Sequence, residues 1–255
     1  MKVLVTFAVD AEFAPWRRLR GCWVVRDSLL HAYELRMDGL QVCVILTGMG
    51  CARAWEVNAA SLWDSDFDIC ISSGLAGALR PEHRSGDVLV AEGMRDSKTE
   101  ALLRCDSELT GIAVGRGAKR VGAFYTSDRV LVTAEEKSKV REFGDAVEME
   151  SRRVVGTAAH ADGRRVRSVA IRAISDEVEE DLPFNFNDTM TPSGDVDMRK
   201  VVWALVGRPW TLPRLLHFGR RSRQAARALA GFLDRYVTTL SERQELTARV
   251  EVAGT

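Results

Sequence analysis

Short apolar runs alternate with segments of helical spacing along the first two thirds of the chain. The apolar runs predict strands at residues 3–9, 22–36, 40–46, 68–72, 86–91, 120–125, 146–147 and 166–174. Helices are predicted over residues 12–19 and 52–63, from Thr133 with its capping-box partner Glu136, and from near Glu148. Such alternation indicates an α/β fold with a mostly parallel central sheet and helices around it.

Residues 92–119 are the least regular part of this region and are predicted to form a loop. Neither an internal repeat nor a linker interrupts the pattern, so a single domain is predicted to span residues 1–255.

The last third of the chain has a different character. Between Arg199 and Arg227 there are eight Lys or Arg residues and no Asp or Glu, and Trp203 and Trp210 stand among them. Prolines 209 and 213 are predicted to break the segment into short helical pieces, and an amphipathic helix is predicted over 222–240. A basic, aromatic-rich stretch can lie on an anionic membrane. The alternative, a helix packed on the core with a solvated basic face, is slightly favoured by the pattern alone.

Composition narrows the function classes. The 255 residues are 46% apolar and 28% charged with zero net charge, which argues against nucleic-acid binding by overall electrostatics. The five cysteines form no CxxC pair and the four histidines have no metal-ligand spacing, so neither metal nor cofactor is expected. Free thiols, no signal peptide and no apolar run near 18 residues together predict a cytoplasmic protein.

Acidic residues at three places in the chain are positioned for chemistry. Asp176 ends the very apolar strand 166–174, where a parallel strand delivers a side chain into a crevice and a carboxylic acid can protonate a leaving group. Glu12 follows the first strand, a usual ligand position but also a common place for a helix cap. Glu148 and Glu150 lie at a strand-to-helix junction; they can favour the helix start, or bind a vicinal diol such as ribose.

Residues 73–77 (SGLAG) are predicted to form a small-residue turn after the strand at 68–72, which lets backbone amides approach a ligand closely. This segment is not the dinucleotide fingerprint GxGxxG. The chain also contains no GxSxG elbow, P-loop or HExxH motif.

Five segments together resemble one family. They are residues 1–13 (MKVLVTFAVDAEF), 47–54 (TGMGCARA), 72–94 (SSGLAGALRPEHRSGDVLVAEGM), 146–151 (AVEMES) and 172–176 (RAISD). In order and content they resemble the nucleoside phosphorylase and nucleosidase superfamily, especially methylthioadenosine/S-adenosylhomocysteine nucleosidases. The resemblance covers Met1 to about Asp176 and implies a three-layer αβα domain with a central mixed, partly barrel-like sheet.

The resemblance also implies catalytic roles. Asp176 would protonate the purine at N7, held in place by Ser175, and Glu12 would activate a water molecule. Because Asp176 must then carry a proton near neutral pH, an apolar and water-poor surrounding is expected. With Glu12 in the water-activating place and no arginine in the glycine segments, hydrolysis is favoured over phosphorolysis.

Substrate-binding roles follow in the same way. Glu150 would bind the ribose 2′- and 3′-hydroxyls, with Met149 packing on the sugar and Gly74 allowing close approach of the backbone. Main-chain groups near Val130 and Leu131 would line the base. The family nucleosidases often carry an aromatic residue where this chain has Val130.

The tail departs from the compact nucleosidases, because 79 residues follow Asp176. A basic, apolar insertion at about 196–221 resembles the hopanoid-associated phosphorylase branch, which is linked to removing adenine from the lipid-linked nucleoside adenosylhopane. This resemblance favours lipid contact of the tail over core packing. Methylthioadenosine/S-adenosylhomocysteine or futalosine-type nucleosides, phosphate-dependent cleavage, and nucleoside binding without catalysis remain alternatives. A homodimer with water as co-substrate is expected.

Overall fold

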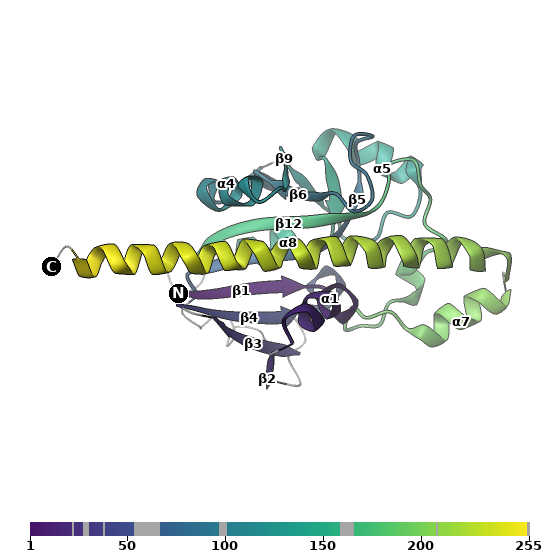
Figure 1. Cartoon of the computed structure of the whole chain (residues 1–255). Coiled ribbons are helices and arrows are strands. Elements are labelled where there is room, and N and C mark those ends of the chain that lie inside the picture. Colours follow the sequence, from purple (N-terminus) through teal and green to yellow (C-terminus); the bar gives the residue numbers. More distant parts are fainter. Residues whose placement is uncertain are drawn as a thin grey trace.

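The computed structural model describes residues 1–21, 23–27, 31–37, 39–53, 67–96, 101–158, 166–207 and 209–253 (Figure 1). Beyond its first two residues, the helix predicted over 52–63 lies outside the described residues.

A large mixed sheet forms the centre of the molecule. Its strands are β1 (Lys2–Phe7), β2 (Val24–Asp27), β3 (Ala32–Met37), β4 (Leu40–Leu46), β5 (Ile69–Ala78), β6 (Val88–Ala91), β7 (Gly93–Asp96), β8 (Leu103–Arg104), β9 (Lys119–Val121), β10 (Phe124–Thr126), β11 (Ala146–Glu148) and β12 (Arg167–Asp176).

The sheet branches at β5. One path runs β2-β3-β4-β1-β5-β11-β10-β7-β8, and β12 joins β5 to β6, which pairs with β9. β5 is parallel to β1 and β12 but antiparallel to β11, so the sheet is mixed, as the family resemblance implied. β5 therefore touches three neighbouring strands, and side chains from all of them meet along it.

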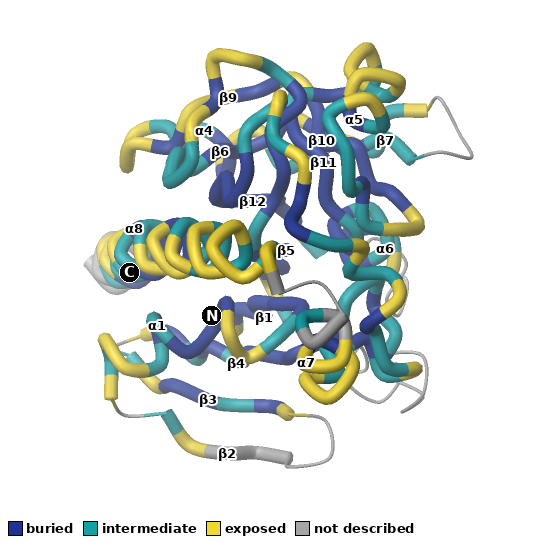
Figure 2. The backbone as a smooth tube through the Cα atoms, turned by 90° about the vertical axis from the view of Figure 1, so that its right-hand side faces the viewer, coloured by how far each residue is buried: buried dark blue, intermediate teal, exposed yellow. Residues whose placement is uncertain are grey.

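Helices and short 3-10 turns surround the sheet. They are α1 (Asp10–Arg20), η1 (Met49–Cys51), α4 (Ser107–Gly115), α5 (Ala134–Val140), η2 (Arg141–Phe143), α6 (Ser151–Ala158), η4 (Phe186–Thr189), α7 (Met198–Gly207), η5 (Pro209–Thr211) and α8 (Leu212–Ala253). α8 crosses the whole molecule and packs on α1 and β12 (Figures 1 and 2).

Apolar residues at successive positions of β1 explain why both faces of the sheet are covered. Val3, Val5 and Phe7 point into a core shared with α1, α4 and α8, whereas Leu4 points into a cluster that includes Val154 of α6. Successive strand residues face opposite sides, so a fully buried strand needs apolar residues at every position.

Several sequence-based boundaries are wrong. The strand predicted over 22–36 is two strands, β2 and β3, and the one over 120–125 is β9 and β10. The predicted loop at 92–119 contains β7, β8 and α4. The side chain of Asp106 caps α4 by accepting a hydrogen bond from the Leu109 amide at 2.9 Å, a start signal that the prediction overlooked.

The largest corrections concern residues 73–77 and Pro213. Residues 73–77 are not a turn; they continue β5 to Ala78, and the glycines among them leave room for larger side chains from neighbouring elements. Pro213 does not break the tail, because it is the second residue of α8, where its missing N–H has no helical partner to lose. The capping box of Thr133 and Glu136 is confirmed.

Candidate active site

Glu12 is turned back from the first turn of α1 toward the sheet. Its Oε2 accepts a hydrogen bond from the Ala8 amide at 3.0 Å and its Oε1 accepts one from the Leu75 amide at 2.9 Å. The side chain is buried, and this burial raises the pKa of Glu12 against the lowering effects of Arg172 and of the backbone amides. Glu12 thus joins the end of β1 to β5.

Arg172 is the charge around which the acids gather. It lies fully buried in the middle of β12, and its Nη2 is 2.6 Å from Oε2 of Glu148 and 3.4 Å from Oε2 of Glu150. Glu12 also interacts with this guanidinium. Three carboxylates therefore share one buried cation, so the cluster tends to retain a proton.

The pKa of Glu150 is raised in this cluster. Burial raises the pKa of Glu150 to about 7, with Arg172 lowering it and the charges of Glu148 and Glu12 raising it further. Its Oε1 accepts a hydrogen bond from the Gly50 amide at 2.8 Å, and the Met149 side chain lies beside Gly50. Glu150 and Met149, both predicted to face the sugar, therefore border the same glycine segment.

Asp176 is the last residue of β12. Its Oδ1 accepts a hydrogen bond from the Ser175 hydroxyl at 2.7 Å, and its Oδ2 lies 2.5 Å from Nζ of Lys137. Lys137 is itself buried and also donates to the carbonyls of Glu177 and Glu180 at 2.8 and 3.1 Å. The expected apolar surrounding of Asp176 is therefore wrong, because a buried ammonium pairs with it.

Two glycines of β5 bring the acids together. Gly74 has a φ of +152°, and a Cβ there would overlap Nη1 of Arg172 and stand 3.1 Å from both carboxylate oxygens of Glu12. A Cβ at Gly77 would stand 2.8 Å from Oδ2 of Asp176. The Glu12–Arg172 cluster and Asp176 thus lie against the same strand, three residues apart.

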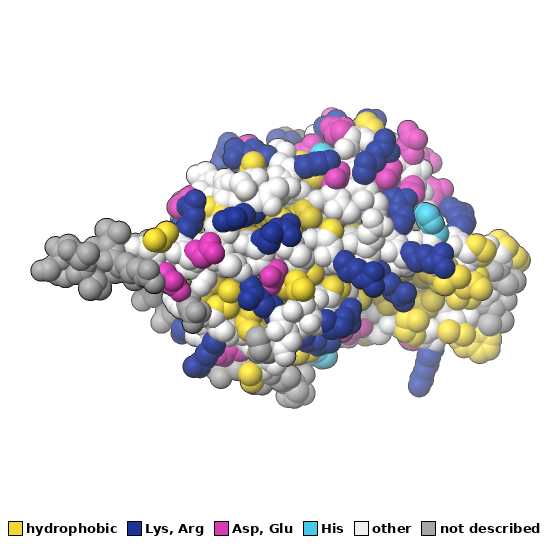
Figure 3. Space-filling view, viewed as in Figure 1, with side chains coloured by type: hydrophobic (Ala, Val, Ile, Leu, Met, Phe, Trp, Pro, Cys, Tyr) yellow, Lys and Arg dark blue, Asp and Glu magenta, His cyan; other side chains and the backbone are white. Residues whose placement is uncertain are grey.

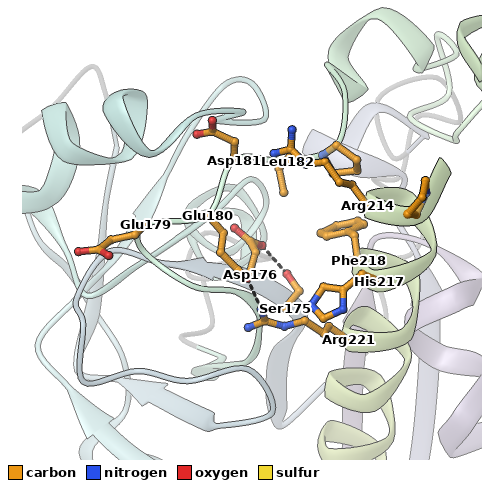
Figure 4. A pocket seen from close by; sticks show the side chains of 12 residues that line it. Ser175, Asp176, Glu179, Glu180, Asp181, Leu182, Arg214, His217, Phe218 and Arg221 are labelled. Carbon is orange, nitrogen blue, oxygen red and sulfur yellow. Dashed lines mark hydrogen bonds and ion pairs between the residues drawn. The ribbon is translucent and has the colours of Figure 1, made fainter. Parts of the chain in front are cut away.

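A cavity of about 530 Å³ opens beside Asp176 (Figure 4). One wall comes from Ser175, Asp176 and the segment 179–183, and the other from the start of α8, including His217 and Phe218. Glu12, Glu150, Met149 and Gly74 do not line this cavity. Figure 4 shows the ring of Phe218 facing Asp176 across the space.

Val130 and Leu131 differ from the expectation. The Val130 amide donates to Oδ1 of Asn187 at 2.9 Å, and the Val130 carbonyl accepts from Nδ2 of Asn187 at 3.0 Å. The side chain of Asn187, on η4, therefore occupies the main-chain groups that were predicted to line a base. The Leu131 side chain packs in a small core cluster with Leu79 and Tyr125.

Three residues of the site were not predicted: Arg172, Glu148 as its main partner, and Lys137. Arg172 had a visible signal, because an arginine inside an otherwise apolar strand must find buried acids. No feature of the sequence indicated Lys137, because a lysine in a short polar helix is usually a surface residue. Within the described residues, no group of His, Cys, Asp and Glu is arranged to hold a metal ion.

Comparison with known proteins finds one similar family and several similar proteins. The family model described as the phosphorylase superfamily matches residues 23–207. The aminodeoxyfutalosine nucleosidase of Campylobacter jejuni is 26% identical over 225 residues, which are 79% of this chain and 97% of that protein. A 5′-methylthioadenosine/S-adenosylhomocysteine nucleosidase of Geobacillus kaustophilus is 25% identical over 146 residues, 55% of this chain and 57% of that protein.

Solved structures share the fold. The 5′-methylthioadenosine/S-adenosylhomocysteine nucleosidase of C. jejuni superposes with a TM-score of 0.69 at 18% identity, covering 93% of this chain and 98% of that one. A futalosine hydrolase mutant of Helicobacter pylori gives 0.69 at 15% identity, covering 94% and 99%.

Proposed function

The chain belongs to the phosphorylase superfamily, and from that premise we propose that it is a purine nucleosidase that hydrolyses the N-glycosidic bond of a 5′-substituted adenosine. One observation carries the proposal: Glu12, Glu150 and Arg172 form a buried charged cluster on the strand that also contacts Asp176. Both of the relatives described above are named as nucleosidases.

The leaving base is the part of the reaction assigned to Asp176. Adenine leaves more easily once N7 carries a proton, and Asp176 borders a cavity large enough for a purine. Nζ of Lys137 lies 2.5 Å from Oδ2 of Asp176, so the ammonium can pass a proton along this hydrogen bond to the carboxylate, which then gives it to N7. Ser175 fixes the other oxygen of the same carboxyl group.

The sugar is assigned to the acidic cluster. Cleavage of the glycosidic bond develops positive charge on the ribose ring, which nearby carboxylates stabilise. Glu150 has one oxygen on the Gly50 amide and the other toward Arg172, so it is positioned firmly enough to accept hydrogen bonds from a diol. Glu12, whose pKa is raised by burial, is suited to take a proton from the attacking water.

Water is preferred to phosphate because the nearby arginines are already neutralised. Arg172 reaches Gly74 from the neighbouring strand, so the absence of arginine from the glycine segments does not by itself exclude an anion site. However, three carboxylates surround Arg172, and Arg53 beside Gly48 is paired with Asp195. A phosphate ion would meet net negative charge here.

For the 5′ group we propose a large apolar substituent, as in adenosylhopane. Glu150 contacts Gly50, and the adjoining Gly48 and Met49 lie against Ser193 and Gly194. This segment leads into α7, whose exposed residues include the apolar Met198, Val202 and Trp203. A substrate with an apolar tail is consistent with such a border.

The test is adenine release from a panel of adenosines that differ only at the 5′ carbon: adenosylhopane, methylthioadenosine and aminodeoxyfutalosine, each with and without phosphate. The proposal expects phosphate-independent release, with the highest kcat/KM for the apolar substituent. Highest activity on aminodeoxyfutalosine would replace the lipid-linked substrate with that of the Campylobacter relative. No adenine release from any of them would overturn the proposed function.

A further inference from the structure

One end of the molecule exposes large apolar side chains. On α7 these are Met198, Val202 and Trp203, exposed by 65%, 55% and 75%. Trp210 of η5 is 71% exposed, and Leu212 and Leu216 of α8 follow. Figure 3 shows apolar atoms gathered at this end, where α7 meets the start of α8. Single exposed apolar residues are ordinary, but a cluster with two tryptophans marks an interaction surface. We call this cluster the apolar tip.

Basic residues adjoin the apolar tip. Arg199, Arg214, Arg220 and Arg223 are exposed, and the described structure gives none of them an acidic side chain within ion-pair distance. Arg221 is different, because it pairs with Glu177 and Glu180 on the body of the protein. The positive charge next to the tip is therefore available to an external partner, and Figure 3 shows it spread along α8.

We propose that the apolar tip docks on an anionic lipid membrane, with Trp203 and Trp210 inserted at the interface. Tryptophan favours the boundary between water and acyl chains, and unpaired arginines attract anionic headgroups. A second copy of the chain fits less well, since it would bring an equally basic surface against this one. Among the described residues no helix is both long and apolar enough to cross a membrane.

The same helix end also borders the cavity of Asp176. His217 and Phe218 line that cavity and directly follow the exposed Leu216 in α8. A docked tip would therefore hold the cavity close to the lipid surface. The docking itself does not depend on the proposed function, because it rests on the exposed side chains alone.

Cosedimentation with vesicles tests the docking. The whole protein is mixed with vesicles of phosphatidylcholine alone, or with an equal mixture of phosphatidylcholine and phosphatidylglycerol. Binding is expected to the mixed vesicles, weakening as salt rises, because salt screens the headgroup attraction. Acyl-chain-brominated lipids should quench the fluorescence of wild type, and this quenching should be lost in Trp203→Phe/Trp210→Phe, because bromine quenches only tryptophans within the bilayer.

Matched variants separate apolar insertion from charge. Trp203→Ala/Trp210→Ala should lower vesicle partitioning at least about tenfold, and Leu19→Ala/Val24→Ala, exposed elsewhere, should not. Arg199→Gln/Arg220→Gln should lower partitioning roughly 25-fold, about fivefold for each cation. The control Arg116→Gln/Arg235→Gln changes two exposed arginines away from the tip. All variants should release adenine from a soluble nucleoside like wild type.

Two results would overturn the docking proposal. One is equal partitioning of wild type and the two tip variants. The other is sedimentation in the absence of lipid in which Trp203→Ala/Trp210→Ala converts a dimer to a monomer, since the tip would then be a contact between copies. Vesicle binding without any nucleosidase activity would support docking and count against the proposed function alone.

Discussion

Asp176 and Glu150 are both buried acids, but their surroundings differ. Asp176 pairs with a single ammonium, that of Lys137, whereas Glu150 shares Arg172 with two other carboxylates. One acid is thus matched by a cation and the other sits in an excess of negative charge. We therefore propose that the Lys137–Asp176 pair supplies the proton for the base and that the acidic cluster around Glu150 stabilises a positively charged sugar.

Asp176→Asn tests the proton donor. Asparagine has nearly the same shape and keeps an oxygen for Lys137, but it cannot give a proton to N7. Adenine release should fall about 100- to 10,000-fold while the protein stays folded. Steady-state kinetics and circular dichroism check this, with the exposed Asp188→Asn as a control for the chemical change. A folded Asp176→Asn protein with wild-type turnover would remove Asp176 from the mechanism.

Glu150→Gln tests the pH dependence of stability. The folded pKa of about 7 lies above the ordinary 4.5, so the folded state keeps a proton that the unfolded chain releases. The contribution of protonated Glu150 to the free energy of unfolding is complete below pH 4.5. About 3 kcal/mol of it is lost as the pH rises to 7. Urea unfolding across this range should show the loss in wild type and in the exposed-site control Glu142→Gln, but not in Glu150→Gln. Parallel curves for wild type and Glu150→Gln would contradict the buried-cluster account.

At the scale of elements, β5 is the strand that assembles the site. It pairs with β1, β11 and β12, and its small residues let Glu12, Arg172 and Asp176 lie against it. The sequence analysis identified the glycines of residues 73–77 as a place where a ligand can approach the backbone. It placed them in a turn, because glycine weakens a strand. The pattern could not predict which side chains from other elements occupy the space beside these glycines.

Gly74→Ala is the substitution that probes this arrangement. Its φ of +152° is unfavourable for alanine, and the new Cβ would push Arg172 away from its acids. The backbone alone should cost about 1–3 kcal/mol of unfolding free energy, with a further loss of activity. Gly111→Ala in α4 meets open space and should instead stabilise by about 0.5–1 kcal/mol. Chemical unfolding and adenine release measure both. A Gly74→Ala protein as stable and active as wild type would refute the close packing.

The acids themselves were easier to predict than their partners. Asp176, Glu12 and Glu150 could be singled out because each lies at or just after the end of a strand, where ligands meet α/β sheets. Lys137 could not, because its burial depends on residues 177–180 folding over α5. Asn187 was missed for the same reason, since it reaches Val130 from 57 residues away.

At the scale of the whole molecule, α8 has two different parts. Its middle packs into the core through Leu229, Leu233 and Tyr236, all fully buried, whereas its start carries exposed Leu212 and Leu216. Core packing, one of the two predictions for this segment, therefore describes the middle of the helix. Lipid contact at its exposed start stays a proposal.

Leu233→Ala and Leu216→Ala test whether the middle of α8 is packed into the core and its start is exposed. Removing a fully buried leucine should lower the unfolding free energy by about 2–5 kcal/mol, because a cavity is left between α8 and the sheet. The exposed Leu216→Ala should stay within about 0.5 kcal/mol of wild type. Thermal or urea unfolding of both variants and of wild type measures these changes in unfolding free energy. Equal effects would mean that α8 is not divided in this way.

The proposed reaction depends on water attacking the sugar. The most direct measurement is to run the reaction in heavy-oxygen water with phosphate present and to analyse the sugar product by mass spectrometry. The cluster of Glu12, Glu150 and Arg172 predicts a free sugar that carries one heavy oxygen at its anomeric carbon, with no sugar 1-phosphate. A sugar 1-phosphate without the heavy oxygen would contradict the hydrolytic mechanism.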